Sequence, residues 1–343
     1  MSSEGTVSPG LNSYTSVIVV GLLLAVVPLV VNGYSLSIAT TTLLIAGLTL
    51  AWNIIGGIGR QFSFAHSLFI ACGAFLPAAL YLEFGVSPWI GMVLGALAAA
   101  ALGIAISWIS FRFDLPNLTF ALITLAFAEV GLLYVLNTPF LGASDGLSIK
   151  RPAGAGPADF AFDAYGSYFL ALSAVVLTLL LVRWIQTSRL GYYLRMIHID
   201  DRSARAMGIN TLQYKTTGMA ISAVVSSVFG TMYAQYMIYI DPHSFASPIL
   251  VIQIILFASI GGLGTLWGPV LAAGFLVPLG EYVRGAIGGT ASGMHFVIYG
   301  IIIVVMILFM PDGIVGGLKR LGHLVRRKRS DTPASPAGAG SKF

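Results

Sequence analysis

Gln61, Ser63 and His66 form the densest polar group within the apolar segments of the N-terminal half, directly after the glycines of the stretch WNIIGGIGRQFSF. An amide, a hydroxyl and an imidazole so close together could line a hydrated path through a membrane, or could form hydrogen bonds that hold the protein together; both interpretations stay open. No metal site is indicated, because no carboxylate or thiol lies at a useful spacing.

A second stretch, FASIGGLGTLWGP, repeats the Ile-Gly-Gly-aliphatic-Gly pattern at Gly261, Gly262 and Gly264. Glycine costs a helix about 1 kcal/mol relative to alanine. The preceding apolar run, 249–260, would extend only about 18 Å, short of a roughly 30 Å bilayer core. Backbone freed at that depth must be buried in protein or line a wet cavity. Glycine breaks in both halves favour a transport path, and close helix packing is the alternative.

Glu129 lies inside the apolar run LTFALITLAFAEVGLLYVLN. An acid within a membrane helix is a functional candidate by default. It could relay protons, contact a substrate amine, or serve structurally by pairing with another residue or by lying at a helix end.

Composition fixes the environment of these residues. Of the 343 residues, 57% are hydrophobic and only 9% are charged, whereas soluble domains carry about 25% charged residues. We therefore predict an all-α polytopic membrane protein with about ten transmembrane helices. The predicted spans are 16–32, 37–55, 67–83, 89–111, 119–137, 166–185, 214–240, 249–260, 268–283 and 294–310.

Basic residues predict the orientation. The loop 186–213 and the tail after 317 are rich in Lys and Arg, so both are predicted to be cytoplasmic. We expect an N-terminal tail over 1–15, a transmembrane domain over 16–317, and a basic then disordered tail over 318–343.

The loop 186–213 contains DDRSARAMG, which predicts a short amphipathic helix that ends at Gly208. Asp200 and Asp201 suit the positive N-terminal end of such a helix. Its apolar side chains, Ala204 among them, need a covering surface, which is either a partner protein or the membrane domain of the same chain.

Four stretches together resemble the M-type permease of the branched-chain amino acid ABC importer family, over most of residues 37–317. They are Gly57 with Gln61, Ser63 and His66; the run LTFALITLAFAE with Glu129; the loop RMIHIDDRSARAMGIN; and GGLGTLWGP. The sequence departs from the family at Arg60 and Ala65, where glycine is usual, at Thr119 in place of a tyrosine, and at Asp201 and Ser203 in place of Glu and Ala.

The resemblance implies a bacterial inner-membrane subunit with partly inverted halves and broken helices. It would pair with a second permease, receive substrate from a periplasmic binding protein, and couple to two ATPase chains through Asp201, Ala204, Arg205 and Gly208. Relatives carry branched-chain amino acids, urea, short amides or aromatic carboxylates. Because Arg60 and Ala65 replace glycines of the family pattern, it stays open whether this chain carries the family's usual substrate.

Two other classes of function compete with this one. A stand-alone ion- or proton-coupled transporter would use Glu129, but has less need for a long amphipathic loop. An intramembrane enzyme would need a motif such as HExxH or GxSxG, and neither occurs. The chain has no GxxxxGK[ST] phosphate loop either, so any ATPase must be a separate chain. No cofactor is expected.

Overall fold

A computed structural model describes residues 12–113, 116–152 and 154–287 of the chain, with a few positions between 300 and 316. Within these residues seven helices are long and apolar enough to cross a membrane. This confirms an all-α polytopic membrane protein. The expected count of about ten is not confirmed, because the run 294–310 lies largely outside the described residues, as do the predicted tail 318–343 and most of 1–15.

The long helices follow the predicted apolar runs closely. Six of the seven are α3 (Gly33–Trp52), α4 (His66–Phe84), α5 (Pro88–Arg112), α6 (Asn117–Asn137), α7 (Ala164–Thr187) and α10 (Thr211–Met237). The seventh crossing is formed by the short α11 (Pro242–Phe245) and α12 (Pro248–Gly261), so that it has 20 residues and the predicted span 249–260 was too short. Helix α13 (Gly268–Ile287) is as long but is not among the seven. The predicted span 16–32 is broken instead, into α1 (Asn12–Ala25) and α2 (Val27–Val30), where Pro28 lies in the first turn of α2.

Helices α4, α5 and α10 form the tightest part of the bundle, and α10 also packs on α3. Glycines allow this close approach, since a Cβ at Gly73 would clash with the backbone of Ser227 and one at Gly230 would lie 2.5 Å from the carbonyl oxygen of Ile70. Helix α7 runs beside α3, and α1 lies on α7. The Tyr168 hydroxyl donates to the carbonyl of Leu24 (2.8 Å), which ties α7 to α1.

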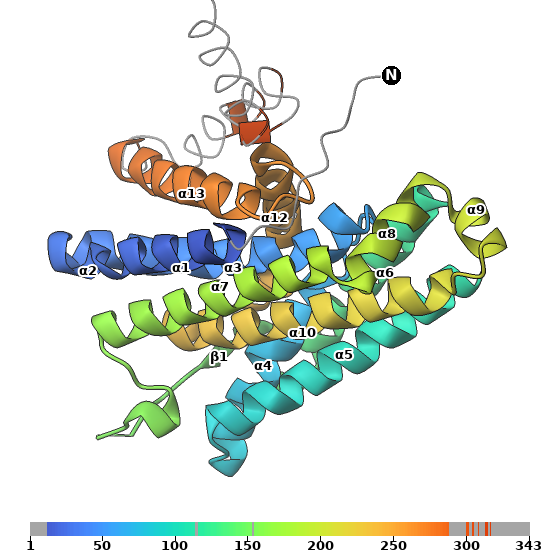
Figure 1. The fold of residues 1–343 in the computed structure, drawn as a ribbon. Helices are drawn as coiled ribbons and strands as arrows, with labels where there is room; N and C mark the ends of the chain where they lie inside the picture. The colour runs from blue at the N-terminus through green and yellow to red at the C-terminus, as the bar shows by residue number, and fades with distance from the viewer. Residues whose placement is uncertain are drawn as a thin grey trace, which may run out of the picture.

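The two ends of the bundle differ in structure (Figure 1). At one end the connection between α6 and α7 carries three short 3₁₀ turns, at Pro139–Leu141, Ala143–Asp145 and Pro157–Asp159. Its strand β1 (Leu147–Ser148) pairs antiparallel with β2 (Tyr239–Ile240) after α10. At the other end α8 (Arg189–Ile199) and α9 (Asp201–Ala206) project beyond the bundle (Figure 1). The short helix predicted in this loop is confirmed as α9, whereas α8 was not predicted.

Candidate functional site

The two glycine-rich breaks lie directly against each other. Helix α3 passes into a π-helical turn, Asn53–Ile58, and the other break connects α12 to α13. The Asn53 side chain joins them, because its Oδ1 accepts from the Gly264 amide (2.9 Å) and its Nδ2 donates to the Thr265 carbonyl (2.9 Å). One buried amide thus satisfies backbone groups that the break leaves free.

Glycine is needed at this crossing for two physical reasons. A Cβ at Gly57 would lie 2.6 Å from the Gly264 nitrogen, and a Cβ at Gly261 would clash with the Gly268 carbonyl. Gly262 and Gly264 also have φ of 112° and 74°, which other residues rarely adopt. Close packing therefore accounts for the glycines.

The crossing also borders a cavity of about 280 Å³, which faces the α8 end of the bundle. Gly57, Gly264 and Arg60 line it, together with Gln186 and His198. The Gln186 Nε2 donates to the Gly264 carbonyl (3.0 Å). The glycines can therefore serve both close helix packing and the lining of a cavity, because the backbone that packs closely at the crossing also forms a wall of the cavity.

Arg60 and Ala65, the two residues that replace glycines of the family pattern, differ in backbone conformation. Arg60 has φ of 51°, in the left-handed region that glycine adopts without strain. An arginine there carries a cost of order 1 kcal/mol and adds a guanidinium to the cavity wall. Ala65, with φ of −63° and a fully buried side chain, occupies ordinary helical backbone.

Gln61, Ser63 and His66 are all buried, and none of them lines the 280 Å³ cavity. The carbonyl of Ser63 accepts from Trp52 Nε1 (2.9 Å). His66 Nε2 lies 2.8 Å from the hydroxyl of Ser222, which itself donates to the carbonyl of Ala51 (2.6 Å). Because a hydroxyl carries one proton, Nε2 must be the donor to Ser222. In this structure these groups connect α3, α4 and α10.

Glu129 lies elsewhere, on the exposed side of α6. It is near the middle of the helix rather than at its end, and none of the described residues forms an ion pair or hydrogen bond with its side chain. Thr124 of the same helix points inward, where its Oγ1 accepts from the Phe64 amide (3.1 Å). The structure therefore places Glu129 apart from the buried polar cluster of Gln61, Ser63 and His66.

The loop helix α9 is fixed to the bundle through Asp201. The Asp201 carboxylate accepts from Arg205 (2.8 Å) and from Lys215 at the start of α10 (3.1 Å). Ala204 is the buried residue of α9. Gly208, with φ of 83°, reverses the chain after α9, and a Cβ there would meet open space.

The start of α9 is capped by Asp200, whose carboxylate accepts from the amides of Arg202 (3.0 Å) and Ser203 (3.3 Å). The hydrogen bond from the Ser203 hydroxyl holds the pKa of Asp200 below its usual value. The outer side of the loop leaves Ile199 83% and Met207 61% exposed. The loop thus combines a rigidly attached base with an uncovered apolar tip.

The sequence analysis missed three residues that build this region, namely Asn53, Gln186 and Ser222. Their signal was weak, because each is a single polar residue in or beside an apolar run. An amide just ahead of a glycine pair, as at Asn53, is the feature that could have pointed to the crossing.

Comparison with known proteins gives consistent results. The family described as "Branched-chain amino acid transport system / permease component" matches residues 34–307. The high-affinity branched-chain amino acid transport system permease protein LivM of Salmonella typhimurium is 27% identical over 313 residues, covering 84% of this chain and 71% of the relative. LivM of Escherichia coli K12 is also 27% identical, over 86% of this chain and 73% of the relative. No solved structure matches.

Proposed function

Since the chain belongs to the family of permease components of branched-chain amino acid transport systems, we propose that it is the M-type membrane subunit of an ATP-binding cassette importer. It forms half of a translocation path for branched-chain amino acids or for a related small polar solute, such as urea, an amide or an aromatic carboxylate. The observation that carries this proposal is the family match across residues 34–307.

The exposed carboxylate of Glu129 supports a second permease subunit. A charged side chain near the middle of a membrane helix is costly when it faces lipid, by about 2.5–3.5 kcal/mol even on the mildest scale. Leu122, Val130 and Leu133 are likewise exposed on α6. We infer that a second permease covers this part of α6, and that Glu129 borders the path between the two subunits.

The α8–α9 loop supports a cytoplasmic ATPase partner. Ile199 and Met207 present apolar surface to solvent at a projecting tip (Figure 1), while Asp201 fixes the base of α9 to α10. A rigid helix with an apolar tip suits the transmission of motion from a docked protein. By the positive-inside rule, the basic residues of the loop and of the tail support a cytoplasmic location for this end.

Reconstitution tests the transport proposal. The chain is co-purified with the second permease and two ATP-binding subunits, and proteoliposomes are supplied with the binding protein. Uptake of labelled leucine, urea, acetamide and benzoate is then measured with and without ATP. We expect ATP-dependent uptake of at least one of these solutes. Uptake by this chain alone, driven by an ion or proton gradient, would instead establish the stand-alone transporter.

Gly208 offers a matched pair of variants for the coupling proposal. Gly208→Arg should uncouple ATP hydrolysis from uptake, because a bulky residue with positive φ costs about 1–3 kcal/mol and distorts the turn after α9. Gly208→Asn should be mild, since asparagine tolerates this conformation. Substrate-stimulated ATPase activity and uptake are measured on the same proteoliposomes. Normal coupling in the Arg variant would contradict the role of this loop.

A further inference from the structure

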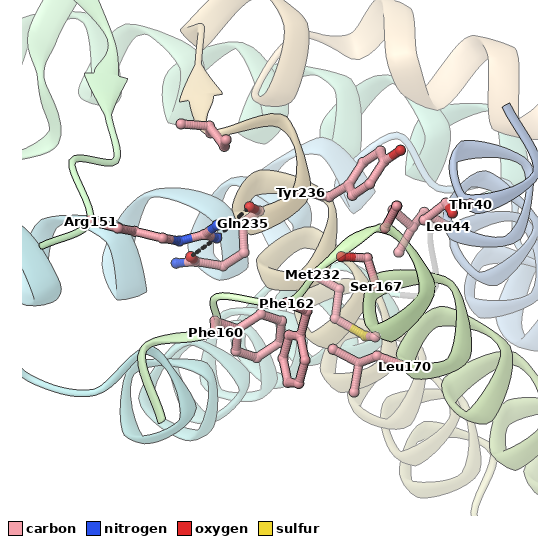
Figure 2. A pocket seen from close by; sticks show the side chains of 12 residues that line it. Thr40, Leu44, Arg151, Phe160, Phe162, Ser167, Leu170, Met232, Gln235 and Tyr236 are labelled. Carbon is pink, nitrogen blue, oxygen red and sulfur yellow. Dashed lines mark hydrogen bonds between the residues drawn. The ribbon is translucent and has the colours of Figure 1, made fainter. Parts of the chain in front are cut away.

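A separate cavity of about 150 Å³ lies at the end of the bundle opposite α8 and α9. Helices α3, α7 and α10 and the segment between β1 and α7 enclose it (Figure 2). None of its lining residues belongs to the glycine crossing, the polar cluster around His66 or the α9 loop. It therefore requires an explanation of its own.

Arg151 supplies the only charged side chain among the residues that line this cavity. Its Nη2 donates to the carbonyl of Gln235 (2.8 Å) and to Oε1 of the same residue (3.3 Å), which fixes the guanidinium against α10 (Figure 2). Its Nε is buried and has no hydrogen-bond partner among the described residues. A buried donor without a partner is unusual in folded proteins. Because Nε has almost no accessible surface, a ligand in the cavity would contact the other N–H groups of the guanidinium.

The acidic groups near Arg151 do not neutralise it by direct contact. Asp159 and Tyr81 are the titratable groups that interact with it electrostatically. No ion pair joins Arg151 to a carboxylate within the part of the chain that the structure describes. The guanidinium stays charged at all physiological pH values, and within the described residues Asp159 acts on it only from a distance.

The rest of the wall is mixed, with polar groups of Thr40, Ser167, Gln235 and Tyr236 beside an apolar side that is well fixed. Phe160 and Phe162 form one side, with Met232 and Leu170 beside them (Figure 2). Phe160 also packs on Trp89, with ring centroids 4.4 Å apart, and the Trp89 indole donates to the carbonyl of Pro157 (2.8 Å). The aromatic wall is therefore held in place from behind.

We propose that this cavity binds a small monocarboxylate with a compact apolar body, of the size of isovalerate. The carboxylate would accept from the guanidinium of Arg151, a favourable charge-assisted arrangement, and the branched body would lie against Phe160, Phe162 and Met232. A cavity of roughly 150 Å³ holds a molecule about as large as benzene. An α-amino acid fits less well, because its ammonium would find no anion in the wall. The site is thus distinct from the proposed transport path.

Binding to the full chain in lipid nanodiscs tests the proposal, with calorimetry and the fluorescence of Trp89 as readouts. The probes are isovalerate, the neutral isostere isovaleramide, and valine. We expect isovalerate to bind at least tenfold more tightly than either of the others. Equal binding of the acid and the amide, or tighter binding of valine, would overturn the assignment.

Variants separate the site from general effects on folding. Arg151→Gln should weaken isovalerate binding at least tenfold, whereas the control Arg112→Gln, at an exposed arginine on α5, should leave it unchanged. Ser167→Leu fills the cavity without touching the guanidinium and should abolish binding while the thermal midpoint of the protein is retained. Equal loss of binding in the Arg112 control, or full binding by the Ser167 variant, would refute the site.

Discussion

The buried cluster around His66 and the exposed carboxylate of Glu129 are both polar groups in or beside membrane helices, but they lie in opposite environments. His66, Ser63 and Ser222 are enclosed by α3, α4 and α10, and their hydrogen bonds connect these helices. Glu129 faces outward from α6 and is paired with none of the described residues. The comparison teaches that a polar residue in an apolar segment needs a partner or a special environment. Its place in the sequence does not say whether that partner lies inside the subunit or on a neighbouring one.

The glycine crossing belongs with the enclosed cluster, and it gives the largest expected effect. Gly57→Leu would force a side chain into the Gly264 backbone and displace Asn53. We expect a cost above the roughly 3 kcal/mol that overpacking usually reaches, because backbone rather than a side chain must move. Size-exclusion profiles of membrane extracts should lose the folded peak, as they should for Gly262→Leu.

Gly274→Leu is the control for this prediction. Gly274 lies on the exposed side of α13, and a Cβ there would meet open space. This variant should retain the wild-type profile and uptake. A normal profile for Gly57→Leu would mean that the two breaks do not pack as closely as they do here.

Ser222→Ala gives an intermediate effect and sharpens the comparison. It would leave the buried Nε2 of His66 without a partner, at a cost of about 1–3 kcal/mol. We expect a lower thermal midpoint with unchanged uptake per folded complex. The control is Ser226→Ala, one turn further along α10, whose buried hydroxyl has no hydrogen-bond partner among the described residues, so that its removal should be neutral or stabilising.

A strong loss of uptake in Ser222→Ala, at normal thermal stability, would break the comparison. It would mean that the His66 cluster takes part in translocation rather than only in holding the helices together.

Glu129→Gln should have the smallest effect on stability, within about 0.5 kcal/mol, because the side chain contributes no ion pair within the described part of the chain. Uptake by the complete complex should nevertheless fall about tenfold, equivalent to about 1.4 kcal/mol, if Glu129 borders the path. Thermal midpoints and initial uptake rates are measured in parallel.

Glu83→Gln makes the same chemical change at the exposed end of α4 and should affect neither quantity. Equal uptake by wild type and Glu129→Gln would remove Glu129 from the path. A large loss of subunit stability would instead point to an interaction inside the chain.

Much of the architecture was accessible from the sequence. The apolar runs gave the long helices, since a bilayer demands about 20 apolar residues for each helical crossing. The turn after α9 was accessible because its signal, a glycine at a C-terminus, is local. The break in the first span was not predicted, although Pro28 is a residue that commonly breaks helices. Helix α8 was not predicted either, because a glycine and two tyrosines interrupt its amphipathic pattern.

The sequence by itself determined that this chain spans a membrane, that two of its helical segments break at glycines, and that an acid lies within a third. Composition and local spacing suffice for these features, because each depends on a residue and its immediate neighbours. Only the tertiary structure decided that the two breaks meet, that Asn53 and Ser222 hold the interior together, and that Glu129 faces outward. Those facts depend on contacts between residues far apart in the chain, such as Asn53 and Gly264, which local spacing does not encode.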